Sequence, residues 1–353
     1  MAKKSEEKTT GLGLLGRLKK AAHVEYADVM SNFDEVQPRE FISSGNYLLN
    51  CLLAADPNKG MPTGKIMTLA GPPGCGKTFT MFEIFKNAQK LGYTCVLYDS
   101  EFANNDKDAL TARGIDIDNL LYIPIDTVEN LKTSILNLVE EISPDDKVII
   151  GIDSLGNLST SKEMTDSIDG SDKKDMTRAA VMKALFRTIT MKCGIKQIPV
   201  IGISHVYAAV GSFIPQNVVG GGSGIQYMSS IVIQMSKAQD KDSAGVVGAV
   251  VTAKTDKNRF AKEKSKVKFT INFNTGMNPY SGLLGFFEEE KVFKKEGRSY
   301  VYNGEKYGPK QLNKEFWDKE LQGNLGEYLK NKFRYCSITD ELGIDDVEGE
   351  EDD

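Results

Sequence analysis

The feature that most constrains this chain is the run Gly71-Pro72-Pro73-Gly74-Cys75-Gly76-Lys77-Thr78, which matches the phosphate-binding pattern G-x-x-x-x-G-K-[ST]. An apolar strand is predicted before it at 66–70 and a helix after it at 77–91. Small residues let backbone N–H groups approach phosphate oxygens, and the helix N-terminus adds partial positive charge. We expect Lys77 to reach the β- and γ-phosphates and the Thr78 hydroxyl to bind Mg²⁺. The run therefore predicts a site for ATP and Mg²⁺; a chance glycine-rich turn, the alternative, would not explain both flanks.

Apolar strand-like runs alternate with helix-like stretches through the middle of the chain. Strands are predicted at 66–70, 94–99, 121–125, 147–152 and 199–204, with further candidates at 230–235, 248–254 and 268–273; helices are predicted at 77–91, 107–113, 128–142 and 176–192. This alternation is typical of a parallel sheet covered by helices on both faces. It predicts an α/β fold, a P-loop NTPase core with a mostly parallel central sheet flanked by helices.

Composition excludes several classes of protein. With 353 residues, 40% of them hydrophobic, the chain is long enough to bury a large core. The five cysteines form no C-x-x-C pair, and with two histidines they favour reduced thiols over disulfides or a zinc site. No apolar run of about 18 residues and no secretory leader are present, so we expect a cytoplasmic protein without a membrane partner.

The ends of the chain differ in composition from its middle. We predict an N-terminal arm for subunit assembly (1–40), the core (41–285), a small C-terminal accessory module (286–339) and an acidic disordered tail (340–353). The tail holds nine acids and no Lys or Arg, so the rest of the chain carries a net charge of +4 although the whole carries −5. Such a tail is either a solubilising end or a competitor for a basic groove that binds nucleic acid.

Three polar residues follow predicted strands at the edge where the phosphate loop begins. Asp153 ends the strand at 147–152 and is expected to orient Mg²⁺. Glu101, just past the strand at 94–99, is placed to activate a water molecule, and His205, after the strand at 199–204, to contact the γ-phosphate. The alternatives are a strand-end cap, a surface acid and a structural histidine.

A glycine-rich stretch follows His205 and includes Gly220, Gly221, Gly222, Ser223 and Gly224. So many glycines indicate a loop that can order on a ligand, and such a loop can follow a nucleic-acid backbone without reading bases. We expect DNA contacts from this loop and from Lys173, Lys174 and Arg178, although each basic residue alone is also compatible with a solvated helix face.

Five segments in chain order strengthen this interpretation: Asp99-Ser100-Glu101, 114–121, 153–158, 175–178 together with 183–187, and 278–284. Together they resemble the core of RecA-type homologous recombinases, and most closely the phage UvsX recombinase family, over residues 40–285. The segment 107–110 lacks the aromatic that this family often stacks on adenine.

The resemblance implies an ATP-dependent recombinase that forms helical filaments on single-stranded DNA and exchanges homologous duplex DNA. It implies DNA-binding loops at 159–175 and 206–225, and a basic pair, Lys257 and Arg259, that reaches a neighbouring subunit's ATP. A solvated basic turn is the alternative for this pair. The implied partners are further copies of the chain, a mediator and a single-strand-binding protein, in a bacterial cytoplasm or, for a phage protein, the host's. Two other functions stay open: a hexameric RecA-fold helicase motor, and an ATP-dependent switch or scaffold that binds no DNA.

Overall fold

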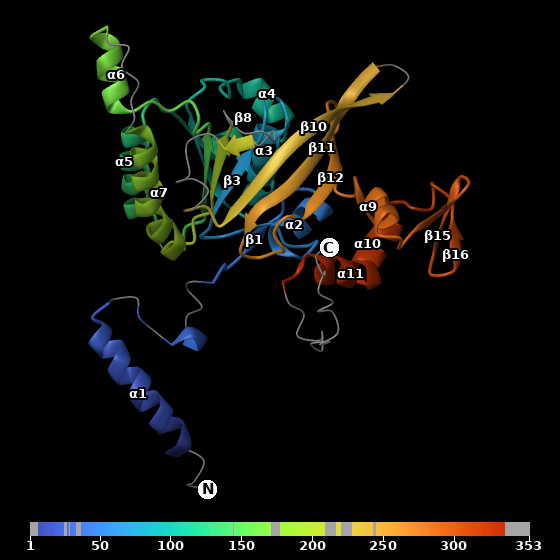
Figure 1. Ribbon diagram of the computed structural model, residues 1–353, viewed down its shortest axis with the longest axis horizontal. Helices are drawn as coiled ribbons and strands as arrows, with labels where there is room; N and C mark the ends of the chain where they lie inside the picture. Colours follow the sequence, from blue (N-terminus) through green and yellow to red (C-terminus); the bar gives the residue numbers. More distant parts are fainter. Residues whose placement is uncertain are drawn as a thin grey trace, which may run out of the picture.

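The computed structural model describes residues 6–24, 27, 29–32, 37–143, 145–170, 177–208, 217–219, 228–242 and 245–335. A nine-stranded sheet forms its centre, in the order β13-β12-β11-β10-β3-β7-β6-β4-β5 (Figure 1). The strands are β3 (Ile66–Ala70), β4 (Thr94–Asp99), β5 (Leu120–Pro124), β6 (Val148–Asp153), β7 (Val200–Ser204), β10 (Ile231–Asp242), β11 (Gly245–Asn258), β12 (Lys266–Asn272) and β13 (Gly276–Met277). Strands β10, β3, β7, β6, β4 and β5 are parallel, and the other three continue the sheet antiparallel. The predicted α/β fold with a mostly parallel sheet is confirmed.

Helices cover both faces of the sheet. The central strands are apolar on both faces, so both must be shielded from water, and their residues are buried. On one face lie α5 (Val128–Glu141) and α7 (Arg178–Ile195), whose apolar stripes pack against β6 and β7. On the other lie α2 (Tyr47–Ala54) and α3 (Lys77–Lys90). The short helices α4 (Lys107–Ala112), η3 (Ile117–Asn119) and α6 (Ser161–Ile168) lie in the connections.

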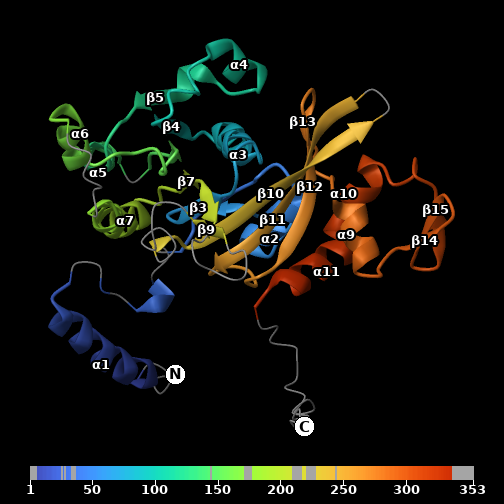
Figure 2. The same cartoon turned by 45° about the horizontal axis from the view of Figure 1, so that its top comes forward.

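The hairpin of β10 and β11 is much longer than the strands predicted at 230–235 and 248–254. Its ladder runs from the pair Ile231–Asn258 to the pair Asp242–Gly245, and both strands extend well past β3 (Figure 2). The outer part carries exposed side chains, such as those of Ser236, Lys237 and Gln239. Since the side chains of β10 are exposed there, the apolar pattern of β10 stops before the strand does.

The C-terminal segment packs on the α2 face of the core. It contains α9 (Leu283–Glu289), the three-stranded sheet β14 (Lys294–Glu296), β15 (Ser299–Tyr302) and β16 (Glu305–Tyr307), α10 (Lys314–Gln322) and α11 (Asn324–Phe333). Aromatic rings hold it together: Phe287 stacks on Trp317, and Phe293 on Tyr302, with ring centroids 4.7 Å apart for the second pair. These side chains belong to the same core as α2 and β12.

The N-terminal segment stands apart from the sheet. Helix α1 (Glu6–Ala22) and the short η1 (Met30–Asn32) precede β1 (Phe41–Ile42), which pairs with β2 (Met61–Pro62) (Figures 1 and 2). A second small hairpin joins β8 (Val206–Ala208) to β9 (Asn217–Val219). Within the described residues, no helix combines the length and the apolar character needed to cross a bilayer. The predicted tail at 340–353 lies outside the described residues.

Candidate nucleotide site

The phosphate loop is packed tightly between β3 and α3. A Cβ atom on Gly71 would lie 2.4 Å from the Met235 carbonyl oxygen of β10. Gly76 has φ +93° and is the N-cap of α3, and a Cβ atom there would lie 2.8 Å from Ile271 Cδ1 of β12. Glycine is therefore required at both positions, and the loop is shaped by the strands beneath it.

The Lys77 ammonium is held inside this loop. Its Nζ donates to the carbonyl oxygens of Gly71 at 2.8 Å and Pro72 at 2.9 Å, and the side chain is buried. Burial lowers the pKa of Lys77, while Cys75, Asp153 and Glu101 oppose this shift. A buried ammonium whose hydrogen bonds go to neutral carbonyls fits an anionic ligand, because a phosphate oxygen would supply the missing charge.

Thr78 and Asp153 meet at the mouth of the loop. The Thr78 hydroxyl donates to Asp153 Oδ2 at 2.8 Å, and the Asn104 amide donates to the same oxygen at 3.1 Å. Burial raises the pKa of Asp153, the bond from Thr78 lowers it, and the charge of Glu101 raises it further. A hydroxyl and a carboxylate at this spacing are the hard oxygen donors that Mg²⁺ prefers, so these residues fit the metal.

Glu101 and His205 lie at the same edge of the sheet. Asp99 and Asp153 are register partners at the ends of β4 and β6, and β7 ends next to β6, so the residues that follow converge. His205 Nε2 lies 3.2 Å from Glu101 Oε1, and the Ser154 hydroxyl donates to the same oxygen at 2.6 Å. His205 Nδ1 is buried and has no hydrogen-bond partner among the described residues. The nitrogen that reaches the cleft side is therefore Nε2, which is engaged with Glu101.

These side chains line one cleft of about 600 Å³, the size of a small-molecule site. Phe273, directly after β12, is 66% exposed and lines the same cleft, as does Arg113 after α4. Sequence reasoning found no aromatic for a base at 107–110 and missed Phe273, because a phenylalanine after a strand reads as a core residue. It also missed Asn104 and Ser154, whose only signal is that they follow strands which end at this edge.

The predicted basic pair lies elsewhere. Lys257 is in β11 and Arg259 directly follows it, near the amino-terminal end of β3, whereas the phosphate loop leaves the carboxyl-terminal end. Burial lowers the pKa of Lys65 and of Lys257, and the charge of Arg259 lowers both further. Three cations therefore gather at the end of the sheet opposite the nucleotide cleft.

The predicted DNA-binding residues are only partly described. Arg178, at the start of α7, donates to the backbone carbonyl oxygens of Leu158 at 2.9 Å, Gly156 at 2.6 Å and Leu155 at 3.3 Å. Its guanidinium thus holds the β6–α6 connection in place. The other predicted residues lie outside the described part of the chain: Lys173, Lys174, Gly220, Gly221, Gly222, Ser223 and Gly224.

The fold and the loop together define a P-loop α/β protein. Residues 26–278 match the family model of the RecA N-terminal domain. Over 240 residues the chain is 35% identical to the "Recombination and repair protein" of Enterobacteria phage T4. The aligned region covers 67% of this chain and 60% of that protein. The matched region thus spans about three fifths of the relative's length. A solved structure titled "Crystal structure of the RadB recombinase" superposes with a TM-score of 0.49 and 15% identity, over 66% of this chain and 97% of that chain.

The chain belongs to the RecA family, as its family match shows. The resemblance inferred from the sequence is confirmed. The RecA-like fold accounts for the position of the site, because loop, acids and histidine all follow strands at the carboxyl-terminal edge of one parallel sheet.

Proposed function

We propose that this protein is an ATP-dependent DNA recombinase, which forms helical filaments on single-stranded DNA and pairs it with homologous duplex. The observation that carries the proposal is the single cleft that contains the loop Lys77, the Thr78–Asp153 pair and the Glu101–His205 pair on a RecA-family fold. The phage relative's name, a recombination and repair protein, supports the same activity.

In this proposal the phosphate loop and Lys77 hold the triphosphate, while Thr78 and Asp153 hold Mg²⁺. Bound Mg²⁺ would neutralise charge on the phosphate oxygens. Glu101 accepts a proton from the attacking water, since it lines the cleft and its carboxylate is only partly exposed. His205 connects Glu101 to the β7–β8 segment, which leads to the predicted DNA-binding loop.

Lys257 and Arg259 complete the site of a neighbouring copy. They lie at the end of the sheet opposite their own phosphate loop, so the same chain's triphosphate is an unsuitable partner. A cation supplied by a second subunit stabilises charge on the transferring phosphoryl group and makes hydrolysis depend on assembly.

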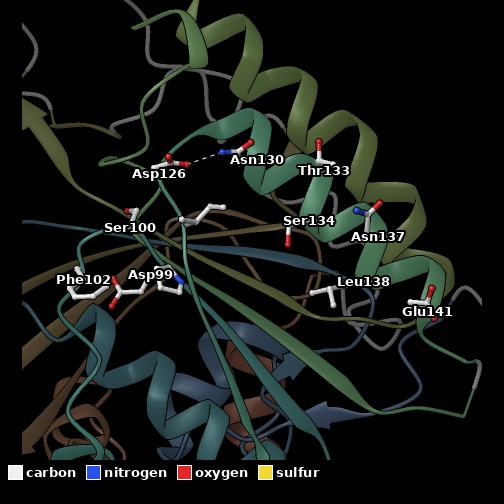
Figure 3. A pocket seen from close by; sticks show the side chains of 12 residues that line it. Asp99, Ser100, Phe102, Asp126, Asn130, Thr133, Ser134, Asn137, Leu138 and Glu141 are labelled. Atoms are coloured by element: carbon white, nitrogen blue, oxygen red, sulfur yellow. Dashed lines mark hydrogen bonds between the residues drawn. The ribbon is translucent and has the colours of Figure 1, made fainter. Parts of the chain in front are cut away.

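The N-terminal arm supports self-assembly. Leu14, Leu15 and Leu18 of α1 are each about half exposed. Along α5 runs a groove of about 1050 Å³, whose wall includes the 65% exposed ring of Phe102 and the acid Glu141 (Figure 3). The lining of this groove is mostly polar, with Phe102 and Leu138 among its apolar members, so it is the exposed leucines of α1 that favour packing on another copy of the chain.

ATP hydrolysis with and without single-stranded DNA, combined with electron microscopy, tests the proposal. We expect DNA to stimulate hydrolysis and to yield helical filaments. Hydrolysis without DNA stimulation, and the absence of filaments, would contradict it. DNA binding measured over a salt series should show a steep slope, because phosphate neutralisation releases counterions. The absence of such a slope would favour the switch or scaffold.

The hexameric helicase motor is the second candidate, because a trans-acting cation pair also fits a closed ring. Closed rings in the microscope and ATP-driven unwinding of a duplex would favour it. Strand exchange without unwinding favours the recombinase.

A further inference from the structure

Ser154 is buried at the end of β6, next to the catalytic candidates. It has no exposed surface, and its hydroxyl donates to Glu101 Oε1 at 2.6 Å. Its backbone is fixed as well: the Ser154 N–H donates to Ser100 Oγ at 3.0 Å, and Ser100 Oγ donates to the Ser154 carbonyl oxygen at 2.7 Å. Ser154 therefore holds its hydroxyl in one place relative to Glu101.

The Glu101 carboxylate is bound asymmetrically. The Ser154 hydroxyl and His205 Nε2 both bond to Oε1, at 2.6 Å and 3.2 Å. Among the described residues, no hydrogen bond reaches Oε2. The Glu101 N–H donates to Asp99 Oδ1 at 2.9 Å, which fixes the backbone. The side-chain torsions of Glu101 are then set by the contacts with Ser154 and His205. The geometry thus makes one carboxylate oxygen an anchor and leaves the other for the cleft.

We propose that Ser154 is a positioning residue for ATP hydrolysis, which fixes the Glu101 carboxylate so that Oε2 faces the attacking water. This inference rests on the proposed function, because it deepens the role given there to Glu101. Ser154 does not touch the reacting atoms. Its contribution is orientation: a glutamate has several side-chain torsions, and a base must lie within hydrogen-bond reach of the proton that it accepts.

His205 alone is a weaker anchor than the two contacts together. Its bond to Oε1 is 0.6 Å longer than the bond from Ser154, and its side chain is partly exposed. Loss of the serine hydroxyl would leave the carboxylate held only by this longer contact. The chemical step should therefore slow, while the nucleotide, which is held by the phosphate loop, should bind as before.

Steady-state ATP hydrolysis by full-length Ser154→Ala tests the inference. We expect kcat to fall about tenfold or more, as a misplaced catalytic group requires, with KM for ATP and the affinity for a fluorescent ATP analogue within about twofold of the wild type. Ser44→Ala is the matched control, because Ser44 is equally buried and its hydroxyl donates at 2.7 Å to Asn50, away from the cleft. We expect this control to keep the wild-type kcat.

Ser154→Cys guards against a variant that fails to fold. Cysteine fills nearly the same volume and is a poor hydrogen-bond donor, so it should lose kcat as alanine does. A double mutant gives the sharpest reading: if Ser154 acts through Glu101, then Glu101→Gln/Ser154→Ala should be no slower than Glu101→Gln alone. Additive losses, or a Ser154→Cys enzyme with the wild-type kcat, would overturn the inference alone. A wild-type chain that does not hydrolyse ATP would overturn the proposed function and this inference with it.

Discussion

The two ends of the central sheet differ in what they offer to a triphosphate. The carboxyl-terminal end holds the phosphate loop, two acids and a histidine around one cleft. The amino-terminal end holds three cations, Lys65, Lys257 and Arg259, close enough for the charge of Arg259 to lower the pKa of the two lysines in addition to burial. In the proposed function, the first end binds the triphosphate and activates water, and the second supplies positive charge.

Under the proposed function, this difference makes a pair of copies the unit of function. Phosphoryl transfer needs both an activated water and cations around the transferring group. In one chain these sets lie at opposite ends of the strands, so a head-to-tail contact would bring them together. Such a contact has a different surface on each partner and therefore extends into a ring or a helix.

The largest expected effect comes from the carboxyl-terminal end. Lys77→Ala removes the cation inside the phosphate loop, and we expect kcat for ATP hydrolysis to fall at least about a hundredfold, with a clear loss of nucleotide affinity. Circular dichroism should show an unchanged fold. An active Lys77→Ala enzyme would contradict the role of the loop.

The next largest effect is expected from a substitution at the amino-terminal end of the sheet. Arg259→Ala should lower kcat about a hundredfold, and its own phosphate loop should still bind nucleotide. Mixing Arg259→Ala with Lys77→Ala should restore part of the activity. Where the two variants meet, the intact phosphate loop of the Arg259→Ala copy can face the intact Arg259 of the Lys77→Ala copy. Lys266→Ala, an exposed lysine in β12, serves as the control. Failure of the mixture to recover would rule out action between copies.

A smaller effect concerns Arg178. Arg178→Ala leaves the carbonyl oxygens of the β6–α6 connection without their donor, so we expect the free energy of unfolding to fall by about 2 kcal/mol, seen as a lower Tm. If Arg178 only holds this connection, the salt slope of DNA binding stays unchanged. A slope reduced by about one would instead show a phosphate contact. The exposed Lys183 on α7 provides the comparison variant.

The smallest effect lies at the amino-terminal end. Glu40 accepts hydrogen bonds from Lys147 Nζ and the Tyr93 hydroxyl, each at 2.7 Å. Burial raises the pKa of Glu40, but these two bonds outweigh it and the net shift is downward. The stabilisation is therefore present at neutral pH and lost as pH falls below the ordinary glutamate value of about 4.3. Glu40→Gln should lower the free energy of unfolding by less than about 1 kcal/mol at pH 7, with the difference vanishing near pH 3 in a denaturant titration.

Much of this arrangement could be predicted from the sequence. The strands that end in Ala70, Asp153 and Ser204 were predictable because they are buried on both faces and read as continuous apolar runs. Their polar successors then had to converge, since the carboxyl-terminal ends of parallel strands share an edge.

The rest depended on contacts between distant residues. The outer part of β10 was missed because its exposed polar residues carry no apolar period. Asn104, Ser154 and Phe273 have residue types common after a strand, and only the fold brings Asn104 and Phe273 to the cleft and Ser154 into contact with Glu101. From the sequence, Arg178 was predicted to contact DNA or to be solvated. Its three carbonyl acceptors come from a segment 20 to 23 residues away, which the sequence alone does not place beside it.

The packing of Gly71 and Gly76 against β10 and β12 has a thermodynamic consequence. A further carbon atom at Gly71 would meet the backbone of β10, so this part of the phosphate loop cannot shift toward β10 without moving that strand; at Gly76 the neighbouring atom is the end of the Ile271 side chain. The loop therefore loses its conformational entropy when the sheet folds, and not when a nucleotide arrives. In the proposed function, nucleotide affinity is thus set in part by the stability of the β10–β11 hairpin against which the phosphate loop packs.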